Sequence, residues 1–213
     1  MFWIKTLFKS IATIFGNMSQ RVHLSTTSER RPFRGELLAG CFISTTTKHQ
    51  DERGSFTKIL GETKPNNVLE DCKISELFYS RSRKSVVRGM HFQVPPYSGK
   101  KLVWLTEGQI LDVIVDLRQG SNTFHKFFAT VIDSDSGAIV VPEGCAHGYE
   151  VLSEFATVCY AQTMPHSSDH DTGILWNSFG MDWSTSTPIL SARDLGLPLL
   201  SEFKSPFTFG RNC

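Results

Sequence analysis

The feature that most constrains the fold of this chain is a series of short β-type segments separated by turns. Apolar and β-branched stretches alternate with Gly- and Asp-containing turns over residues 101–163. The expected strands are Lys101–Thr106, Gln109–Leu117, Phe124–Ile132, Ala138–Val141, His147–Leu152 and Thr157–Thr163. Many short strands at regular spacing are typical of a β-sandwich or a closed β-barrel. The chain has no Gly-rich phosphate loop and no alternation of strands with helices, so an all-β fold is predicted.

The segments on either side of this series are more irregular. The expected upstream elements are a first strand at Gly35–Ser44, a glycine turn in Asp51–Phe56, renewed apolar alternation at Thr57–Leu60, a loop at 61–72 and a strand at Ile74–Tyr79. Ser80–Ser85 is basic and is expected to be a surface loop, which is either simply solvated or attracts anions. Downstream of Met164 the chain is rich in loops, and Ser191–Asp194 resembles a capping box that opens a short helix.

Length and composition indicate one soluble globular domain with a sizeable core. The chain has 213 residues, a hydrophobic content of 40% and a formal net charge of +1. This charge balance gives no argument for a nucleic-acid partner or for a membrane. The five cysteines form no CxxC pair. We therefore expect neither a disulfide framework nor a zinc site, and a reducing cytoplasmic location fits best.

The first 34 residues differ from the rest and are expected to be an extension and linker, with the folded domain at residues 35–213. Apolar residues recur at helical spacing between Trp3 and Phe15, opposite a basic and polar face. Lys9 interrupts this run, which is too short to span a bilayer. Three interpretations stay open for residues 1–17: a helix on a membrane surface, a targeting leader, or an upstream extension with Met18 as the working start. We favour the extension.

The stretch Arg88–Gln93 (RGMHFQ) contains a histidine in an otherwise strand-like environment. It follows the β-branched pair Val86 and Val87, so a strand is predicted. Alternation along this strand predicts that two sets of side chains face opposite ways, namely Arg88, Met90 and Phe92 against Gly89, His91 and Gln93. A lone histidine in a strand is more commonly a hydrogen-bonded core residue than a catalytic one. The role of His91 therefore depends on the motifs downstream.

A second motif contains Gly137, Pro142, Gly144 and His147 at the spacing of the second cupin motif. In cupins this turn leads into a strand that points one histidine into a barrel. The companion metal motif needs His-x-His followed by a glutamate, whereas this chain reads His91-Phe92-Gln93. Three nitrogen or carboxylate ligands are the usual minimum for a catalytic metal. The chain therefore resembles a cupin barrel that has lost its metal and kept two histidines.

Further motifs make the resemblance specific. In chain order they are DERGSF (51–56), RGMHFQ (88–93), KLV (101–103), LDVIVDLR (111–118), S-x-TF (121–124), VPEGCAHGY (141–149), LSEFATVCY (152–160), GILWN (173–177) and LSARD (190–194). Over residues 35–207 their order and spacing resemble the dTDP-4-dehydrorhamnose 3,5-epimerase family. The resemblance implies a cupin double-stranded β-helix, no cofactor and no metal, and a homodimer with shared N-terminal strands.

The reaction of this family removes a proton next to a ketone and returns a proton to the opposite face of the sugar ring. By resemblance His91 is the base, and imidazole groups titrate near neutral pH, as such a base requires. Asp194 is implied as the partner that orients the ring and stabilises the imidazolium. Without the resemblance, Asp194 would be interpreted as the N3 residue of a capping box, and the two roles are compatible.

The resemblance also implies an oxyanion partner and an acid. Lys101 would stabilise the enolate oxygen at C4, and Tyr160 would protonate carbon from the opposite face. Taken alone, Lys101 would be a solvated residue at a strand end, and Tyr160 a buried tyrosine with a satisfied hydroxyl. His147 is implied as a second pocket histidine, with Asp112 as its supporting carboxylate.

Substrate binding is implied for Arg53, Arg88 and Gln93, and a planar guanidinium suits a diphosphate. Two stretches depart from the family pattern. Glu76–Phe78 stands where many relatives have a Gln and an Asn that contact the nucleotide sugar, and Met164–His166 replaces an aromatic that packs on the substrate. These departures leave the nucleotide and the sugar open, more than the class of reaction.

The resulting hypothesis is a metal-free epimerase of a nucleotide-linked 4-keto-6-deoxy sugar. It acts at C3, C5 or both, in the making of a surface polysaccharide sugar such as that of a lipopolysaccharide O-antigen. Three alternatives stay open: a cupin 3,4-ketoisomerase, a sugar-binding cupin without turnover, and a metallo-cupin oxygenase. The second would be favoured if His91 and Asp194 proved to be distant.

Overall fold

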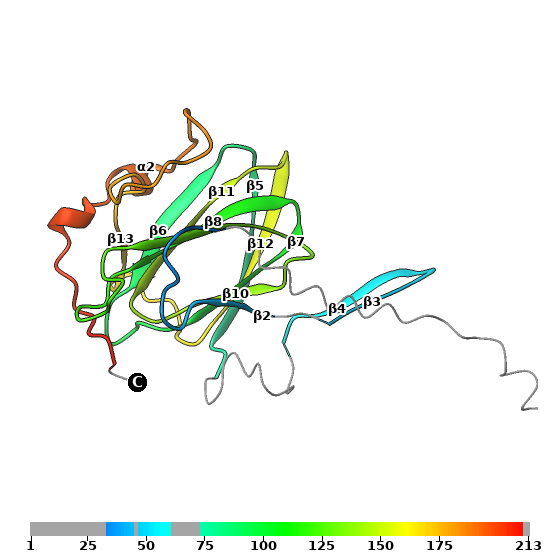
Figure 1. Cartoon of the computed structure of the whole chain (residues 1–213), viewed down its shortest axis with the longest axis horizontal. Coiled ribbons are helices and arrows are strands. Elements are labelled where there is room, and N and C mark those ends of the chain that lie inside the picture. The colour runs from blue at the N-terminus through cyan, green and yellow to red at the C-terminus, as the bar shows by residue number, and fades with distance from the viewer. Residues whose placement is uncertain (1–32, 45–46, 61–72, 211–213) are drawn as a thin grey trace, which may run out of the picture. The chain divides into compact units, whose positions relative to one another are not determined.

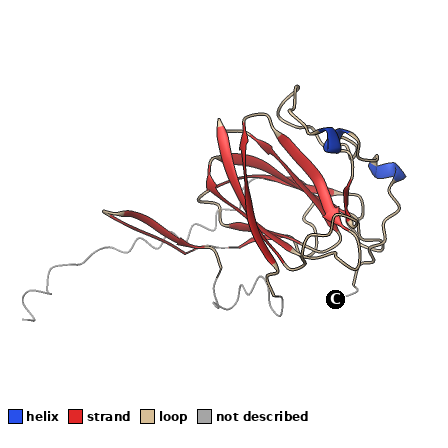
Figure 2. Ribbon diagram, turned by 180° about the vertical axis from the view of Figure 1, so that it is seen from behind, coloured by secondary structure: helices blue, strands red, loops and turns tan. Residues whose placement is uncertain are grey.

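The computed structural model describes residues 33–44, 47–60 and 73–210, and almost all of its regular structure is β-strand. The strands are β1 (Phe33–Gly35), β2 (Phe42–Ser44), β3 (Thr47–Asp51), β4 (Gly54–Lys58), β5 (Glu76–Arg83), β6 (Val87–Gln93), β7 (Lys101–Glu107), β8 (Gln109–Asp116), β9 (Phe127–Asp133), β10 (Ala138–Val141), β11 (Cys145–Val151), β12 (Phe155–Gln162) and β13 (Asp171–Gly173). Within the described ranges the helices are α2 (Ala192–Leu195) and η1 (Leu200–Glu202) (Figure 2).

Eleven of the strands form two antiparallel sheets. The strand order is β1-β9-β8-β11-β6-β13 in the six-stranded sheet and β2-β10-β7-β12-β5 in the five-stranded sheet (Figure 1). We call these two sheets and the segment after β13 the barrel domain. Strands β3 and β4 pair only with each other and belong to a separate compact unit. The arrangement confirms the predicted all-β, cupin-type jelly roll.

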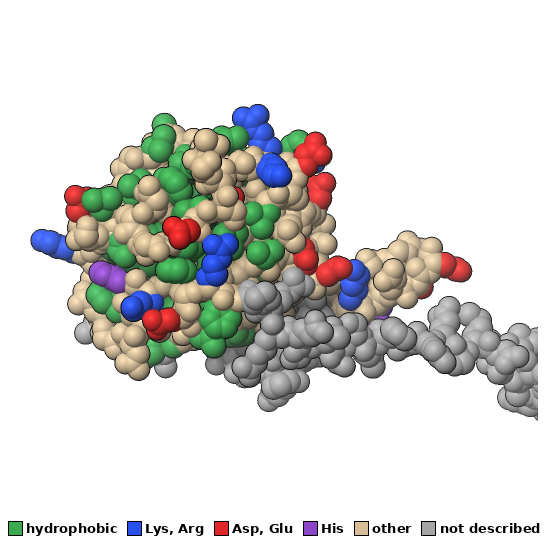
Figure 3. All heavy atoms as spheres, turned by 45° about the horizontal axis from the view of Figure 1, so that its top comes forward, with side chains coloured by type: hydrophobic (Ala, Val, Ile, Leu, Met, Phe, Trp, Pro, Cys, Tyr) green, Lys and Arg blue, Asp and Glu red, His purple; other side chains and the backbone are tan. Residues whose placement is uncertain are grey.

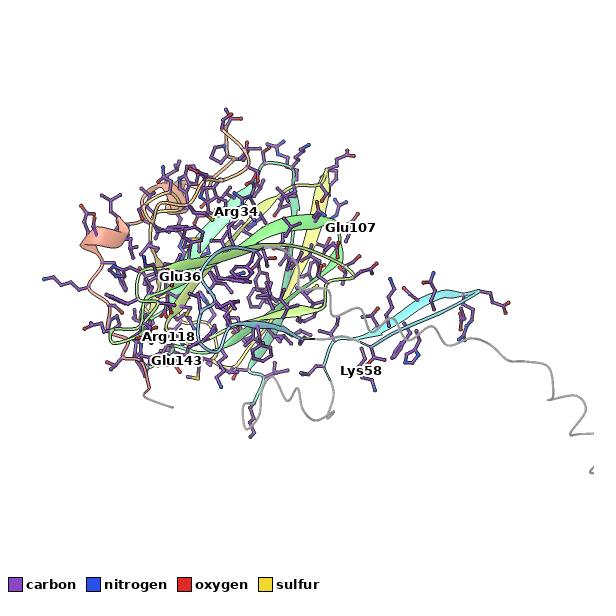
Figure 4. The ribbon with its side chains drawn as sticks, viewed as in Figure 1. Arg34, Glu36, Lys58, Glu107, Arg118 and Glu143 are labelled. Carbon is purple, nitrogen blue, oxygen red and sulfur yellow. The ribbon has the colours of Figure 1, made fainter. Side chains whose placement is uncertain are left out.

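The main core lies between the two sheets, because side chains on alternate positions of each strand point inward. Its members come from both sheets and include Ile110, Ile114 and Tyr149 of the six-stranded sheet, and Val103 and Val158 of the five-stranded sheet. In Figure 4 the side chains of the two sheets fill the space between them.

A second core explains the long C-terminal segment. The outward side chains of β8, among them Leu111 and Val113, pack against Ile174, Phe179 and Phe207. Figure 1 shows the orange-to-red C-terminal segment beside β6 and β13. Strand β8 is therefore apolar on both faces, and all of its residues after Gln109 are buried.

The strand predictions succeeded where the alternation was regular and failed in two places. Ala138–Val141 matches β10 residue for residue. The predicted first strand Gly35–Ser44 was wrong, because β1 ends at Gly35 and β2 begins only at Phe42. The predicted surface loop Ser80–Ser85 was also wrong. Most of this stretch is strand β5, which pairs with β12 along its whole length and turns Ser82 inward and Arg81 outward.

A β-bulge on β6 overturns the predicted faces of that strand. His91 is opposite His147 on β11, whereas Arg88 is opposite Tyr149, so β6 has one more residue than β11 over this interval. Gly89 has a positive φ of 118°, a backbone conformation that residues with a side chain rarely adopt. As a result, Arg88 faces the same side as His91 and not the side of Met90, which is buried in the second core.

The predictions for residues 1–32 and 61–72 lie outside the described residues. Within the described ranges, no helix has the length and apolar character needed to cross a membrane. On the face that Figure 3 shows, positive and negative side chains are interspersed among apolar and polar ones. This mixture agrees with the near-zero net charge of the sequence.

Candidate active site

An open pocket lies between the two sheets, with a volume of about 410 Å³. Six of the sequence-predicted site residues line it, namely Arg88, His91, Gln93, Lys101, His147 and Tyr160. Its other lining residues are Glu76, Phe78, Ser80, Gly148, Tyr149, Gln162, His166, Asp171 and Arg193. A concave site with several convergent titratable groups has the character of a catalytic pocket.

The first histidine–carboxylate pair joins β6 to helix α2. His91 Nε2 lies 2.6 Å from Asp194 Oδ1, and the His91 side chain is 26% exposed while that of Asp194 is 4% exposed. Ser191 caps the helix by accepting a hydrogen bond from the Asp194 backbone N–H, so the predicted helix start is confirmed. The capped first turn therefore holds Asp194 beside His91, and the distance removes the condition that favoured a non-catalytic cupin.

The protonation state of Asp194 follows from its surroundings. Burial alone would raise the pKa of this carboxyl. The hydrogen bond from His91, the charge of that ring and the Gly89 backbone N–H together hold the pKa of Asp194 below its ordinary value. Asp194 is therefore an ionised partner that can stabilise an imidazolium on His91.

A second pair lies directly beside the first. His147 on β11 is the register partner of His91 on β6. Its Nε2 atom lies 2.7 Å from Asp112 Oδ2, and the two side chains are 4% and 0% exposed. The other carboxylate oxygen of Asp112 has no hydrogen-bond partner within the described chain. This pair is therefore more deeply buried than the first, although His147 lines the pocket as His91 does.

The surroundings of Lys101 lower the pKa of its ammonium group. Burial is the main reason that the pKa of Lys101 falls from its ordinary value to about 8. The nearby Asp171 opposes this fall and Arg193 adds to it. These two neighbours form an ion pair with a distance of 2.8 Å between Arg193 Nη2 and Asp171 Oδ2. Lys101 can therefore supply positive charge to an oxyanion at neutral pH, where its ammonium form still dominates.

Tyr160 lies on the five-stranded sheet, opposite the sheet that carries His91. Its ring stacks on Phe78 with a centroid distance of 4.8 Å and meets the His147 ring edge-on at 6.1 Å. Burial, followed by the neighbouring Tyr149 and Asp112, raises the pKa of Tyr160 well above its ordinary value. Its phenol therefore stays protonated near neutral pH, as a proton donor must.

The three predicted substrate-binding residues have different surroundings. Gln93 Nε2 donates to the Tyr97 and Pro165 carbonyls at 2.9 and 3.1 Å, so it holds a loop at the pocket edge. Arg88 Nε donates to Ser82 Oγ at 2.9 Å. Arg53 is not among the pocket residues: it belongs to the β3–β4 hairpin and forms an exposed ion pair with Asp51. Its role in binding stays a prediction.

The two stretches that depart from the family pattern are joined to each other. Glu76 Oε2 accepts a hydrogen bond from Gln162 Nε2 at 2.8 Å, and Glu76 Oε1 accepts one from the His166 backbone N–H at 2.9 Å. Glu76, Phe78 and His166 all line the pocket. The departures therefore alter one continuous part of the pocket wall.

Some residues that line the pocket were not predicted from the sequence. Tyr149 follows His147 by two positions, so alternation along β11 could have placed both on one face. Arg193 lies in the LSARD motif, but no role in the site was predicted for it. For Asp171 and Ser80 the sequence carries no comparable signal. In the part of the chain that the structure describes, no three His, Cys, Asp or Glu side chains are grouped as a metal site.

Comparison with known proteins agrees with this geometry. The family model described as dTDP-4-dehydrorhamnose 3,5-epimerase matches residues 36–202. The dTDP-4-dehydrorhamnose 3,5-epimerase of Sinorhizobium fredii is 34% identical over 167 residues, which are 76% of this chain and 86% of the relative. The dTDP-4-dehydrorhamnose 3-epimerase of Streptomyces niveus is 37% identical over 169 residues, or 78% and 82% of the two chains.

A solved structure shares the fold. It is the dTDP-6-deoxy-D-glucose-3,5-epimerase of Legionella pneumophila in complex with dTDP-4-keto-L-rhamnose. The two chains are 27% identical with a TM-score of 0.74, and the match covers 81% of this chain and 95% of the other. By its sequence, its jelly-roll fold and the extent of these matches, the chain belongs to the dTDP-4-dehydrorhamnose 3,5-epimerase family.

Proposed function

We propose that this protein is an isomerase that epimerises a dTDP-linked 4-keto-6-deoxy sugar by removing and returning a proton at C3, C5 or both. One observation carries the proposal: a candidate base and a candidate acid face one pocket from different sheets. His91 comes from β6 of the six-stranded sheet and Tyr160 from β12 of the five-stranded sheet. Inversion of a carbon centre needs this arrangement, because the proton leaves from one ring face and arrives on the other.

The steps follow from the charges of the three groups. His91 takes the proton from the carbon next to the C4 ketone, and Asp194 stabilises the imidazolium that forms. The electrons move onto the C4 oxygen, and the Lys101 ammonium stabilises this enolate. Tyr160 then donates its phenolic proton to the opposite face of the carbon, and the ketone forms again.

The relatives support the substrate class. The Sinorhizobium relative is named a 3,5-epimerase and the Streptomyces relative a 3-epimerase. The Legionella structure holds dTDP-4-keto-L-rhamnose. The chain matches both named activities at similar identity, so the number of centres inverted is a question for experiment.

Deuterium exchange tests the proposal directly. The protein is incubated with dTDP-4-keto-6-deoxy-D-glucose in deuterium oxide, and NMR follows label at C3 and C5. We expect label and inversion at one or both centres, and a loss of about 10³-fold in His91→Ala, within the range of general-base catalysis. His125→Asn is the matched control, because His125 lies outside the pocket and Asn tolerates its positive φ of 63°. No label with the folded wild type, or unchanged label in His91→Ala, would overturn the proposal.

We also propose a homodimer. Its support is the family resemblance together with the outer side of β5, an edge strand on which Leu77 and Tyr79 are 71% and 72% exposed. The test is light scattering on the eluted protein, with an expected mass of about twice 23.9 kDa. A monomer at micromolar concentration would contradict this proposal.

The remaining proposals concern cellular context and domain limits. We propose a cytoplasmic enzyme in the making of a surface polysaccharide deoxysugar, such as that of an O-antigen. Free thiols at Cys41, Cys145 and Cys159 suit a reducing compartment. The family match begins at residue 36, which supports the proposal that residues 1–34 precede the catalytic domain. Removal of residues 1–17 should leave exchange unchanged.

A further inference from the structure

A row of side-chain hydroxyl groups leads from the pocket wall to the candidate acid. Tyr149 is 1% exposed, and its hydroxyl lies 2.9 Å from Ser80 Oγ and 3.5 Å from Ser82 Oγ. Tyr160 lines the same pocket as Ser80 and Tyr149, and both neighbours act on the pKa of its phenol, so the three hydroxyl side chains lie close together. Arg88 Nε donates to Ser82 Oγ at the far end of the row. None of these hydroxyl contacts is needed by the reaction steps given above.

The row joins the two sheets of the barrel. Ser80 and Ser82 face inward from β5, beside Tyr160 on the neighbouring strand β12. Tyr149 comes from β11 of the opposite sheet, where its register partner on β6 is Arg88. The bulge at Gly89 turns Arg88 toward this row, so the register of β6 and the hydroxyl row depend on each other.

The protons of this row can be assigned from donor and acceptor capacity. A guanidinium only donates, so Ser82 Oγ accepts from Arg88 and its own proton is available to Tyr149. Each of the neighbouring hydroxyls of Tyr160, Tyr149 and Ser80 can donate once and accept from another. One order has Tyr160 donating to Tyr149, Tyr149 to Ser80, and Ser80 to Tyr160. This order satisfies every member of the ring.

Delivery of the proton changes which hydrogen bonds the Tyr160 oxygen needs. The Tyr160 O–H bond breaks, a C–H bond forms on the sugar with the enolate electron pair, and the C4 ketone is restored. Tyr160 is left as a phenolate, which can only accept hydrogen bonds. It is buried and close to the Asp112 carboxylate, and both surroundings disfavour negative charge. Two donors already within reach would stabilise it without any rearrangement of the backbone.

We infer that Tyr149 and Ser80 are positioning residues that hold the Tyr160 phenolate, with Tyr149 turning its proton from Ser80 to Tyr160 at the moment of transfer. Arg88 acts through Ser82 to keep the Tyr149 hydroxyl in place. This inference rests on the proposed epimerase function. It assigns a role in the second half of the reaction only, because the row does not contact His91.

The kinetic test separates the two halves of the reaction. In Tyr149→Phe we expect the rate of inverted product to fall about 10²-fold, comparable with the loss of one donor to an oxyanion. Deuterium uptake into recovered, non-inverted substrate, which needs only His91, should stay within threefold. Tyr79→Phe is the matched control, since Tyr79 lies on the outer side of β5 and is 72% exposed. Equal loss of both rates, or no loss, would overturn the inference.

A second readout needs neither substrate nor turnover. The protein is labelled with tyrosine carrying carbon-13 at Cζ, and the Tyr160 resonance is assigned with Tyr160→Phe. The resonance should move in Tyr149→Phe and in Ser80→Ala, and should not move in Tyr79→Phe. If Tyr149→Phe does not fold, Ser80→Ala carries both tests. An unmoved resonance in the folded variants refutes the hydroxyl row, whereas an inactive wild type with a moved resonance refutes only the epimerase function.

Discussion

The pocket contains two histidine–aspartate pairs that are chemically alike and differ in almost everything else. His91 and Asp194 join a strand to a helix 103 residues away, and the ring is open to the pocket. His147 and Asp112 lie on neighbouring strands of one sheet, and both side chains are buried. The comparison teaches that two chemically alike pairs can differ in exposure, and this difference is the reason for proposing His91, and not His147, as the base.

The surroundings of the carboxylates explain the division. The Asp194 carboxylate accepts hydrogen bonds from His91 and from the Gly89 N–H and lies in the first turn of a helix, so its charge is well satisfied. Asp112 has one oxygen on His147 and one without a partner in the described chain. It also lies close enough to Tyr160 to raise the pKa of that phenol. We therefore propose that the first pair serves the base, and that Asp112 of the second pair adds to the larger effect of burial on the pKa of Tyr160.

The largest expected contrast is in stability. His147→Ala leaves the fully buried Asp112 carboxylate without its partner, so we expect a loss of about 3–5 kcal/mol in the free energy of unfolding. His91→Ala opens the other pair toward the pocket and should cost no more than about 1 kcal/mol. Urea unfolding of both variants at neutral pH measures the difference. Equal losses would mean that exposure does not distinguish the pairs.

The next expected effect is on the pH profile of the exchange rate, and it depends on Lys101. Burial lowers the pKa of Lys101 to about 8, so its ammonium form dominates below that pH and is lost as the pH rises above it. The Tyr160 phenol stays protonated over the same range. We expect the exchange rate to halve near pH 8 and then to fall about tenfold per pH unit.

Three variants check that assignment. Lys101→Arg should lower the rate but remove the decline, because a guanidinium does not titrate in this range. Asp112→Asn should leave the decline where it is, since the second pair does not act on Lys101. Lys126→Met is the control, because Lys126 is exposed and pairs with Glu36. A decline that persists in Lys101→Arg would assign it to another group.

The smallest expected effect is a shift in the pKa of Lys101, whose direction should differ between variants of its two charged neighbours. Arg193→Ala removes a positive charge, so the pKa of Lys101 rises and the decline moves to higher pH. Asp171→Asn removes a negative charge and moves the decline to lower pH. Each shift should be below one pH unit, because Arg193 is 47% exposed and solvent screens it. Shifts in the same direction would show that the variants act through the fold and not through charge.

Much of this architecture could be predicted from the sequence because a strand repeats every two residues. The apolar, β-branched runs of β8 and β10 between turns predicted strands, and the spacing of Gly137, Pro142, Gly144 and His147 predicted a histidine near the start of β11. The prediction failed at Ser80–Ser85, where the basic side chains suggested a loop. They point outward from a strand whose serines point in, so composition misled where alternation was correct.

The residues of the site divide in the same way. The sequence by itself determined which groups are candidates for the chemistry, since His91, Lys101, Tyr160 and Asp194 lie in recognisable motifs. Only the tertiary structure decided how they act on one another. The extra residue at the Gly89 bulge turned Arg88 to the pocket side, and the packing of the two sheets brought Tyr149 near Tyr160. The physical reason is that alternation fixes facing within one strand, whereas register between strands and packing between sheets are set by contacts among residues far apart in the chain.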